Sequence, residues 1–183
     1  MSHAKIGISA KQLQRELGVT YKIAWRMFKE ICKIITDNAN PLSGQVEVDE
    51  TYIGGKRQGK RGRRVGGKAV VMGMVERQGN AITRVVPDVK AHTLLTMIEQ
   101  NVAKSNKTVV YTDKLLSYNY VERFGYSHEI VQHSAKQYVR GIVHVNTMES
   151  LWGTIKRGID GVNHFVSPLY LQSYLDSCCP IRF

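Results

Sequence analysis

The chain has 183 residues, a length typical of one domain with a small appendage, so a protein with several large cores is excluded. Hydrophobic residues make up 43% of the sequence and charged residues 22%, which favours a folded globular protein over a disordered one. The 26 Lys and Arg residues outnumber the 15 Asp and Glu residues, giving a formal net charge of +11. Such an excess points to a polyanionic partner, with nucleic acid ahead of a membrane.

The sequence predicts neither a membrane protein nor a cysteine-based scaffold. No apolar run approaches the roughly 18 residues that a bilayer-spanning helix needs, and the first ten residues lack the hydrophobic region of a signal peptide. We therefore expect an intracellular protein. The three cysteines, Cys32, Cys178 and Cys179, form no C-x-x-C pair, so we expect no zinc site and no structural disulfide.

Residues 1–36 are predicted to form a helix-turn-helix. Ser9 can cap a helix that runs to Leu17, and Gly18 follows at a position where a tight turn needs positive φ. Thr20 can cap a second helix. Along that helix the residues Ile23, Met27, Ile31 and Ile34 form one apolar stripe. The basic residues on its other faces, which we expect to contact DNA, are Lys22, Arg26 and Lys29.

Residues 37–44 have the composition of a linker, and the hydrophobic period then changes. Residues 45–53 alternate as a strand does, and two further strands, 68–77 and 81–86, flank a turn at 78–80. The elements expected after them are a helix at 89–103, a strand at 108–112, a helix at 115–124, a strand at 128–131, a helix at 145–157 and a last helix that starts at 167–168. This order predicts an α/β domain with a mixed sheet over 45–183, arranged as in the ribonuclease H-like fold.

In that fold the chemistry depends on acidic residues of the first strand, the fourth strand and a later helix. The sequence offers Asp49, Asp113 and Glu149 at these three places. Three converging carboxylates suit a pair of Mg²⁺ ions, which activate the attacking oxygen and stabilise the leaving oxygen at phosphorus. Glu47 and Glu50 are competitors of Asp49 for this role. Glu47 shares the strand face of Asp49, whereas Glu50 should point to the opposite face and pair with a basic neighbour or support the strand.

Three sequence segments resemble bacterial insertion-sequence transposases of the DDE type, in particular the ISXO-like group. These segments are V-D-E-T-Y-I-G-G-K at 48–56, Y-T-D at 111–113 and H-V-N-T-M-E-S-L-W-G-T-I-K-R-G at 144–158. The N-terminal helices are similar to the DNA-binding helices that precede the catalytic domain in that family. The resemblance implies an enzyme of the bacterial cytoplasm and nucleoid that nicks double-stranded DNA at inverted repeats and joins the freed 3′-hydroxyl to target DNA, with Mg²⁺ (or Mn²⁺) as cofactor. It also implies at least a dimer, because two DNA ends are brought together.

By motif position, the resemblance makes Asp49, Asp113 and Glu149 the metal-binding triad. It further implies that Lys156, seven residues after Glu149 and on nearly the same helix face, holds a phosphate near the scissile bond. Asn146, one turn before Glu149, is a second candidate for the third catalytic residue, since some relatives use Asn or His there. Family members begin with a Cys-rich zinc ribbon that this chain lacks, and its ending at 177–183 differs from theirs, so a missing module, a fragment or a truncated copy are all open.

A dense basic segment at 56–68 is interpreted as a phosphate-binding loop. It carries no acidic residue, and such a like-charge cluster repels itself until an anion neutralises it. The residues expected to contact DNA there are Lys56, Arg57, Lys60, Arg61, Arg63 and Arg64. The alternative is a solvated hairpin loop.

Three functions remain open at this stage. The first is a DNA strand-transfer enzyme. The second is a catalytically impaired remnant that still binds inverted repeats, and the third is a ribonuclease H-like nuclease that only hydrolyses. Nicking with joining, binding without cutting, and cutting without joining would distinguish them.

Overall fold

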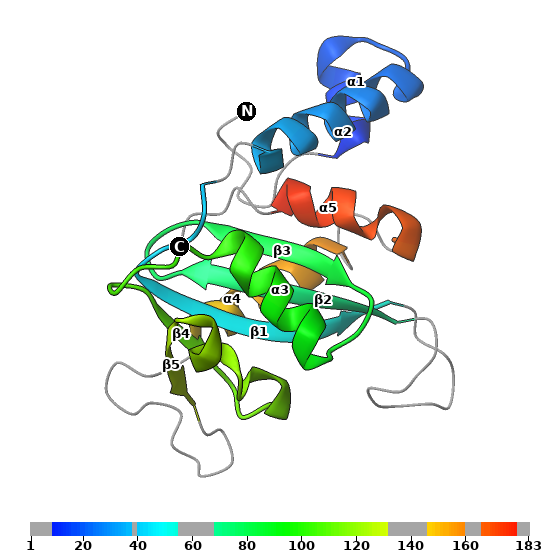
Figure 1. Ribbon diagram of the computed structural model, residues 1–183. Coiled ribbons are helices and arrows are strands. Elements are labelled where there is room, and N and C mark those ends of the chain that lie inside the picture. The colour runs from blue at the N-terminus through cyan, green and yellow to red at the C-terminus, as the bar shows by residue number, and fades with distance from the viewer. Residues whose placement is uncertain (1–8, 38–39, 55–67, 132–145, 160–165, 179–183) are drawn as a thin grey trace.

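A computed structural model describes residues 9–37, 40–54, 68–131, 146–159 and 166–178 (Figure 1). Its centre is a five-stranded sheet with the strand order β3-β2-β1-β4-β5. The strands are β1 (Gln45–Ile53), β2 (Ala69–Glu76), β3 (Ala81–Val86), β4 (Val109–Thr112) and β5 (Ser127–Ile130). β1, β2 and β3 are antiparallel neighbours, whereas β4 is parallel to β1 and to β5. The mixed sheet predicted from the sequence is confirmed.

Helices cover both faces of this sheet (Figure 1). α3 (Ala91–Asn101) lies on one face, and α4 (Asn146–Gly158) and α5 (Leu171–Cys178) lie on the other. Successive side chains of a strand point to opposite faces. Val46 and Val48 of β1 therefore join the core under α3, while Ile53 joins the core under α4. Glu47 and Asp49 share the α4 face of β1.

A glycine allows α4 to lie close to the sheet. A Cβ atom added to Gly73 of β2 would lie 2.6 Å from Met148 Cε and 2.7 Å from Trp152 Cη2, both on α4. Gly73 pairs with Asp49 across the β1–β2 ladder. α4 therefore lies close to the sheet beside Asp49.

The N-terminal segment forms the two helices that its sequence predicts. α1 (Ala10–Leu17) is capped by Ser9, whose Oγ accepts a hydrogen bond from the Gln12 amide at 3.1 Å, and Gly18 follows it with φ 64°. α2 (Tyr21–Asp37) begins directly after Thr20. It packs on α5. Its Trp25 ring also meets the ring of Tyr170, in the 3₁₀ turn η5 (Pro168–Tyr170) just before α5, edge to face with centroids 5.9 Å apart.

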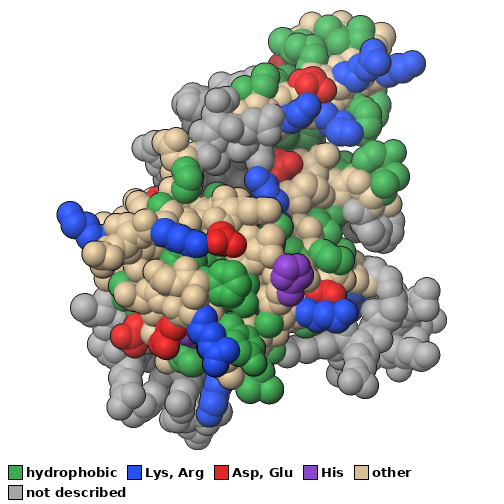
Figure 2. All heavy atoms as spheres, viewed as in Figure 1, with side chains coloured by type: hydrophobic (Ala, Val, Ile, Leu, Met, Phe, Trp, Pro, Cys, Tyr) green, Lys and Arg blue, Asp and Glu red, His purple; other side chains and the backbone are tan. Residues whose placement is uncertain are grey.

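The apolar stripe predicted on α2 does not face the protein interior. Ile23, Met27 and Ile34 are 48%, 40% and 60% exposed, whereas Ala24 and Cys32 are buried. α2 packs on α1 and α5 through the neighbouring face, one residue further along, where the small Ala24 side chain permits close contact. Hydrophobic and basic side chains consequently lie side by side on the surface of this helical pair (Figure 2).

Two predicted boundaries also differ from the structure. Residues 115–124 form two 3₁₀ turns, η1 (Leu116–Tyr118) and η2 (Val121–Phe124), instead of one α-helix. Tyr118 and Val121 are fully buried at a spacing of three, which matches the 3₁₀ period. In the predicted linker, α2 extends to Asp37 and Leu42 is buried beside Val102. None of the helices in the described ranges is both long enough and apolar enough to cross a bilayer.

Candidate active site

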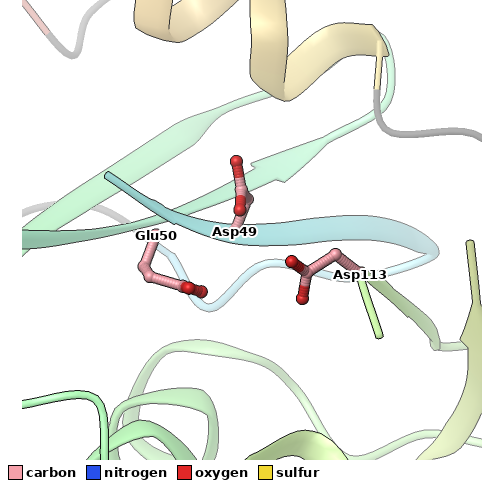
Figure 3. A group of neighbouring side chains, drawn as sticks. All are labelled: Asp49, Glu50 and Asp113. Carbon is pink, nitrogen blue, oxygen red and sulfur yellow. The ribbon is translucent and has the colours of Figure 1, made fainter. Parts of the chain in front are cut away.

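Two aspartates lie side by side where the parallel pairing of β1 with β4 ends. The last paired residues are Val48 of β1 and Thr112 of β4, and the residues that follow them in the chain are Asp49 and Asp113. Their carboxylates, together with that of Glu50, each offer an oxygen, and these oxygens all lie within 4.8 Å of one another (Figure 3). All three side chains are partly exposed.

The two aspartates are held by different elements. Asp49 Oδ2 accepts a hydrogen bond of 2.9 Å from Trp152 Nε1, so its carboxylate is fixed from α4. Asp113 Oδ1 accepts a hydrogen bond of 3.0 Å from the amide of Leu115 in the turn that follows β4. The Thr112 hydroxyl before it lies 2.8 Å from His128 Nε2 and donates to the Asp113 carbonyl oxygen.

Glu50 leaves β1 on the face opposite Asp49, as predicted, and still reaches the same group of oxygens (Figure 3). Its Oε2 accepts a hydrogen bond of 3.1 Å from the hydroxyl of Tyr118, which is fully buried in η1. Burial raises the pKa of the Tyr118 hydroxyl well above its ordinary value, and the negative charges of Glu50, Asp49 and Asp113 raise it further. Tyr118 thus stays protonated and remains a hydrogen-bond donor to Glu50.

Glu47, considered from the sequence as a competitor of Asp49, lies away from this group. It is completely buried, and its carboxylate contacts Arg77 and the first turn of α4. The ion pair with Arg77 Nε is 2.7 Å long.

The third residue of the predicted triad, Glu149, lies in the first turn of α4 and is exposed. Its carboxylate is outside the group that is formed within 4.8 Å by Asp49, Glu50 and Asp113. Lys156 lies in the last turn of the same helix and is exposed. Asn146 is the first residue of α4, and its side chain lies outside the described part of the structure.

The residues predicted to contact DNA on α2 do not share one environment. Lys22 and Arg26 are exposed. Lys29 instead lies over the rings of Trp25 and Tyr170, with its Nζ 4.7 Å and 5.7 Å from their centroids. Its side chain therefore contributes to the contact between α2 and η5, the turn that leads into α5. The basic residues Lys56, Arg57, Lys60, Arg61, Arg63 and Arg64 lie outside the described residues.

The donor set fits a divalent metal ion. Carboxylate oxygens are the ligands that Mg²⁺ and Mn²⁺ favour, and three of them from two adjacent strands meet within the reach of one ion. Sequence reasoning weighed Glu50 as a competitor and expected it to pair elsewhere. Glu50 lies beyond Val48, where the pairing of β1 with β4 ends, and the sequence of β1 alone gives no signal of that boundary.

The arrangement of strands and helices is that of the ribonuclease H-like fold. The catalytic core domain of BIV integrase has a similar structure, with a TM-score of 0.53, 12% sequence identity, and coverage of 74% of this chain and 80% of that one. The model of the ISXO2-like transposase domain matches residues 41–178, and the chain belongs to this transposase family.

Two curated relatives are also associated with mobile elements. An uncharacterized protein in transposable element ISH50 of Halobacterium salinarum is 27% identical over 165 residues, which are 81% of this chain and 56% of that protein. An uncharacterized transposase-like protein of Haemophilus influenzae is 29% identical over 96 residues, which are 52% of this chain and 75% of the relative. The chain therefore spans little more than half the length of the Halobacterium relative.

Proposed function

We propose that this chain carries the catalytic centre of a DDE transposase, which cuts double-stranded DNA at the inverted repeats of its element and joins the freed 3′-hydroxyl to target DNA. The main support is the juxtaposition of the Asp49 and Asp113 carboxylates in a chain of the ISXO2-like transposase family. Because two DNA ends are processed together, the active form is at least a dimer on DNA.

In this proposal Asp49 and Asp113 hold Mg²⁺ (or Mn²⁺), and Glu149 of α4 supplies the third carboxylate. The bound metal would stabilise charge on the attacking and leaving oxygens of an in-line displacement at phosphorus. Trp152 orients Asp49, and the Leu115 amide orients Asp113. Glu50, held by Tyr118, is the alternative third ligand.

The decisive experiment compares single substitutions on labelled inverted-repeat DNA with Mg²⁺. D49N, D113N and E149Q should each abolish cleavage and joining and leave DNA binding nearly unchanged, because each removes a charge that the metal ions need. E50Q is the matched control and should retain cleavage. If E149Q is active and E50Q is inactive, Glu50 is the third ligand. Cutting without joining would instead identify a nuclease, and binding without cutting an impaired remnant.

We further propose that residues 1–36 recognise the element ends. Lys22 and Arg26 are exposed on α2 and can reach groove edges and phosphates, whereas Lys29 lies over the Tyr170 ring of η5. K22A/R26A should therefore weaken the preference for inverted-repeat over scrambled DNA in competition binding. K29A should alter the attachment of α2 and thermal stability more than this preference. If K22A/R26A prefers inverted-repeat DNA over scrambled DNA as strongly as the unmodified protein does, the assignment of end recognition to residues 1–36 is wrong.

A further inference from the structure

Glu47 is a completely buried carboxylate two residues before Asp49 on the same face of β1. A buried carboxylate is costly unless charged and hydrogen-bonding partners surround it. It lies outside the group that contains Asp49 and Asp113, so metal binding there does not account for it.

Three donors from two parts of the chain surround this carboxylate. Oε1 accepts from Arg77 Nε at 2.7 Å and from the Thr147 hydroxyl at 3.0 Å, while Oε2 accepts from the Met148 amide at 3.1 Å. Arg77 is itself fixed, because its guanidinium stacks 4.3 Å over the ring of Tyr111 in β4. Glu47 is thus held by Arg77 from the side of the sheet, and its bonds with Thr147 and Met148 connect it to α4.

Glu47 supplies an acceptor at the start of α4. The first four amides of a helix have no partner within the helix, and Met148 is the third residue of α4. A carboxylate at a helix N-terminus also interacts favourably with the helix dipole. Glu47 therefore fastens the first turn of α4 to β1, and the next residue after Met148 is Glu149.

We propose that Glu47 is a positioning residue that acts through α4 and fixes Glu149 relative to Asp49. This inference rests on the proposed function, in which Glu149 binds the metal. A charge is not required for stability alone, because an apolar pair of similar shape can stabilise a core as well as a buried ion pair. What an apolar pair cannot supply is an acceptor for the Met148 amide.

Two double variants separate positioning from stability. E47Q/R77M removes both charges and keeps an oxygen that can accept from the Met148 amide. E47L/R77M removes both charges and the acceptor while filling a similar volume. Both should fold, and E47L/R77M should melt at a lower temperature than E47Q/R77M, because the buried Met148 amide loses its acceptor.

The measurements are Mn²⁺ affinity by titration calorimetry and the rate of end cleavage. E47L/R77M should lose about 10–100-fold in metal affinity or in kcat, with KM for DNA unchanged, as is typical when a residue that orients a metal ligand is removed. E47Q/R77M should recover most of this loss. Adding E149Q to E47L/R77M should reduce Mn²⁺ affinity no further, because both changes act on the same ligand.

The outcomes identify which proposal fails. If E149Q alone binds Mn²⁺ and cleaves like the unmodified protein, the role of Glu149 is wrong and the positioning role falls with it. If E149Q is impaired in Mn²⁺ binding and cleavage, but E47L/R77M and E47Q/R77M have the same Mn²⁺ affinity and the same cleavage rate, only the positioning role is overturned. Hydrogen exchange of the unmodified protein adds a test that needs no variant. The Met148 amide should be protected, and exchange as fast as that of an uncapped helix terminus would overturn the inference.

Discussion

Gly73→Ala should displace α4 from the sheet at the position beside Asp49. The added Cβ would lie 2.6 Å from Met148 Cε and 2.7 Å from Trp152 Cη2, whereas carbon atoms in contact settle about 3.5–4.0 Å apart. The end of a methionine side chain can move at little cost, but the rigid Trp152 ring has to retreat by about 1 Å. That movement weakens the 2.9 Å hydrogen bond from Trp152 Nε1 to Asp49.

The expected cost follows from these contacts. Overpacking of this kind lowers the free energy of unfolding by about 1–3 kcal/mol. For a chain of 183 residues this corresponds to a fall in melting temperature of about 2–12 °C. Thermal unfolding by circular dichroism measures the change. End cleavage should fall as well, since Asp49 loses its orienting contact.

Gly153→Ala is the matched control. A Cβ on Gly153 would first meet Arg157 Nη1 at 3.2 Å, which is the end of a flexible side chain. Alanine is the better helix former, so stability should be unchanged or rise by up to about 1 kcal/mol. In the G73A/W152F double variant the smaller ring should relieve the clash, making it about as stable as W152F. A G73A melting temperature within about 1 °C of the unmodified protein, or strict additivity with W152F, would refute the steric argument.

Three other changes have defined outcomes. Lys156 is exposed in the last turn of α4, and the resemblance to the transposases implies that it holds a phosphate by its charge. K156A should therefore weaken end processing without altering the Mg²⁺ concentration dependence, and a large shift in the metal requirement would contradict this role. Neutralising Lys60, Arg61, Arg63 and Arg64 together should lower affinity for all DNA sequences about equally. The slope of the log binding constant against log salt concentration should become less steep by about 0.9 per lost phosphate contact. An unchanged slope would indicate that the segment is a solvated loop that does not contact DNA. Burial lowers the pKa of His128 in the folded protein, so the unfolded chain binds a proton at a higher pH than the folded protein does. The free energy of unfolding should therefore fall as the pH drops below about 6.5, the usual pKa of histidine. Urea unfolding at several pH values measures this change, and H128Q should show a weaker pH dependence than the unmodified protein.

Local signals explain why the strands and most helix ends were predictable. Ser9 and Gly18 cap α1 through contacts within four residues, so their effect can be read from neighbouring letters. The alternation of β1 likewise fixes which side chains share a face, which placed Asp49 and Glu50 on opposite sides correctly. The ladder between β1 and β4 then brings Asp49 and Asp113 together, as the strand order implied.

Long-range packing explains what the sequence did not predict. The exposed stripe of α2 follows from the helices that contact it, α1 and α5, and α5 is more than 130 residues away in the chain. The role of Glu47 depends on Arg77 and Met148, which no local spacing relates to it. Glu50 joins the oxygen group only because the β1–β4 ladder ends at Val48, a boundary that the sequence of β1 alone does not reveal.

The carboxylates of the site are held by two separate supports. α4 carries Glu149 and holds Asp49 through Trp152, and Glu47 fastens the start of that helix to β1. Asp113 depends on the turn after β4, which also carries Tyr118, the donor to Glu50. A displacement of α4 therefore moves Glu149 and the partner of Asp49 together, while a change in the turn shifts Asp113 and the partner of Glu50. The β1–β4 ladder places the backbone of the two aspartates side by side, and the two supports then orient their carboxylates on that common base.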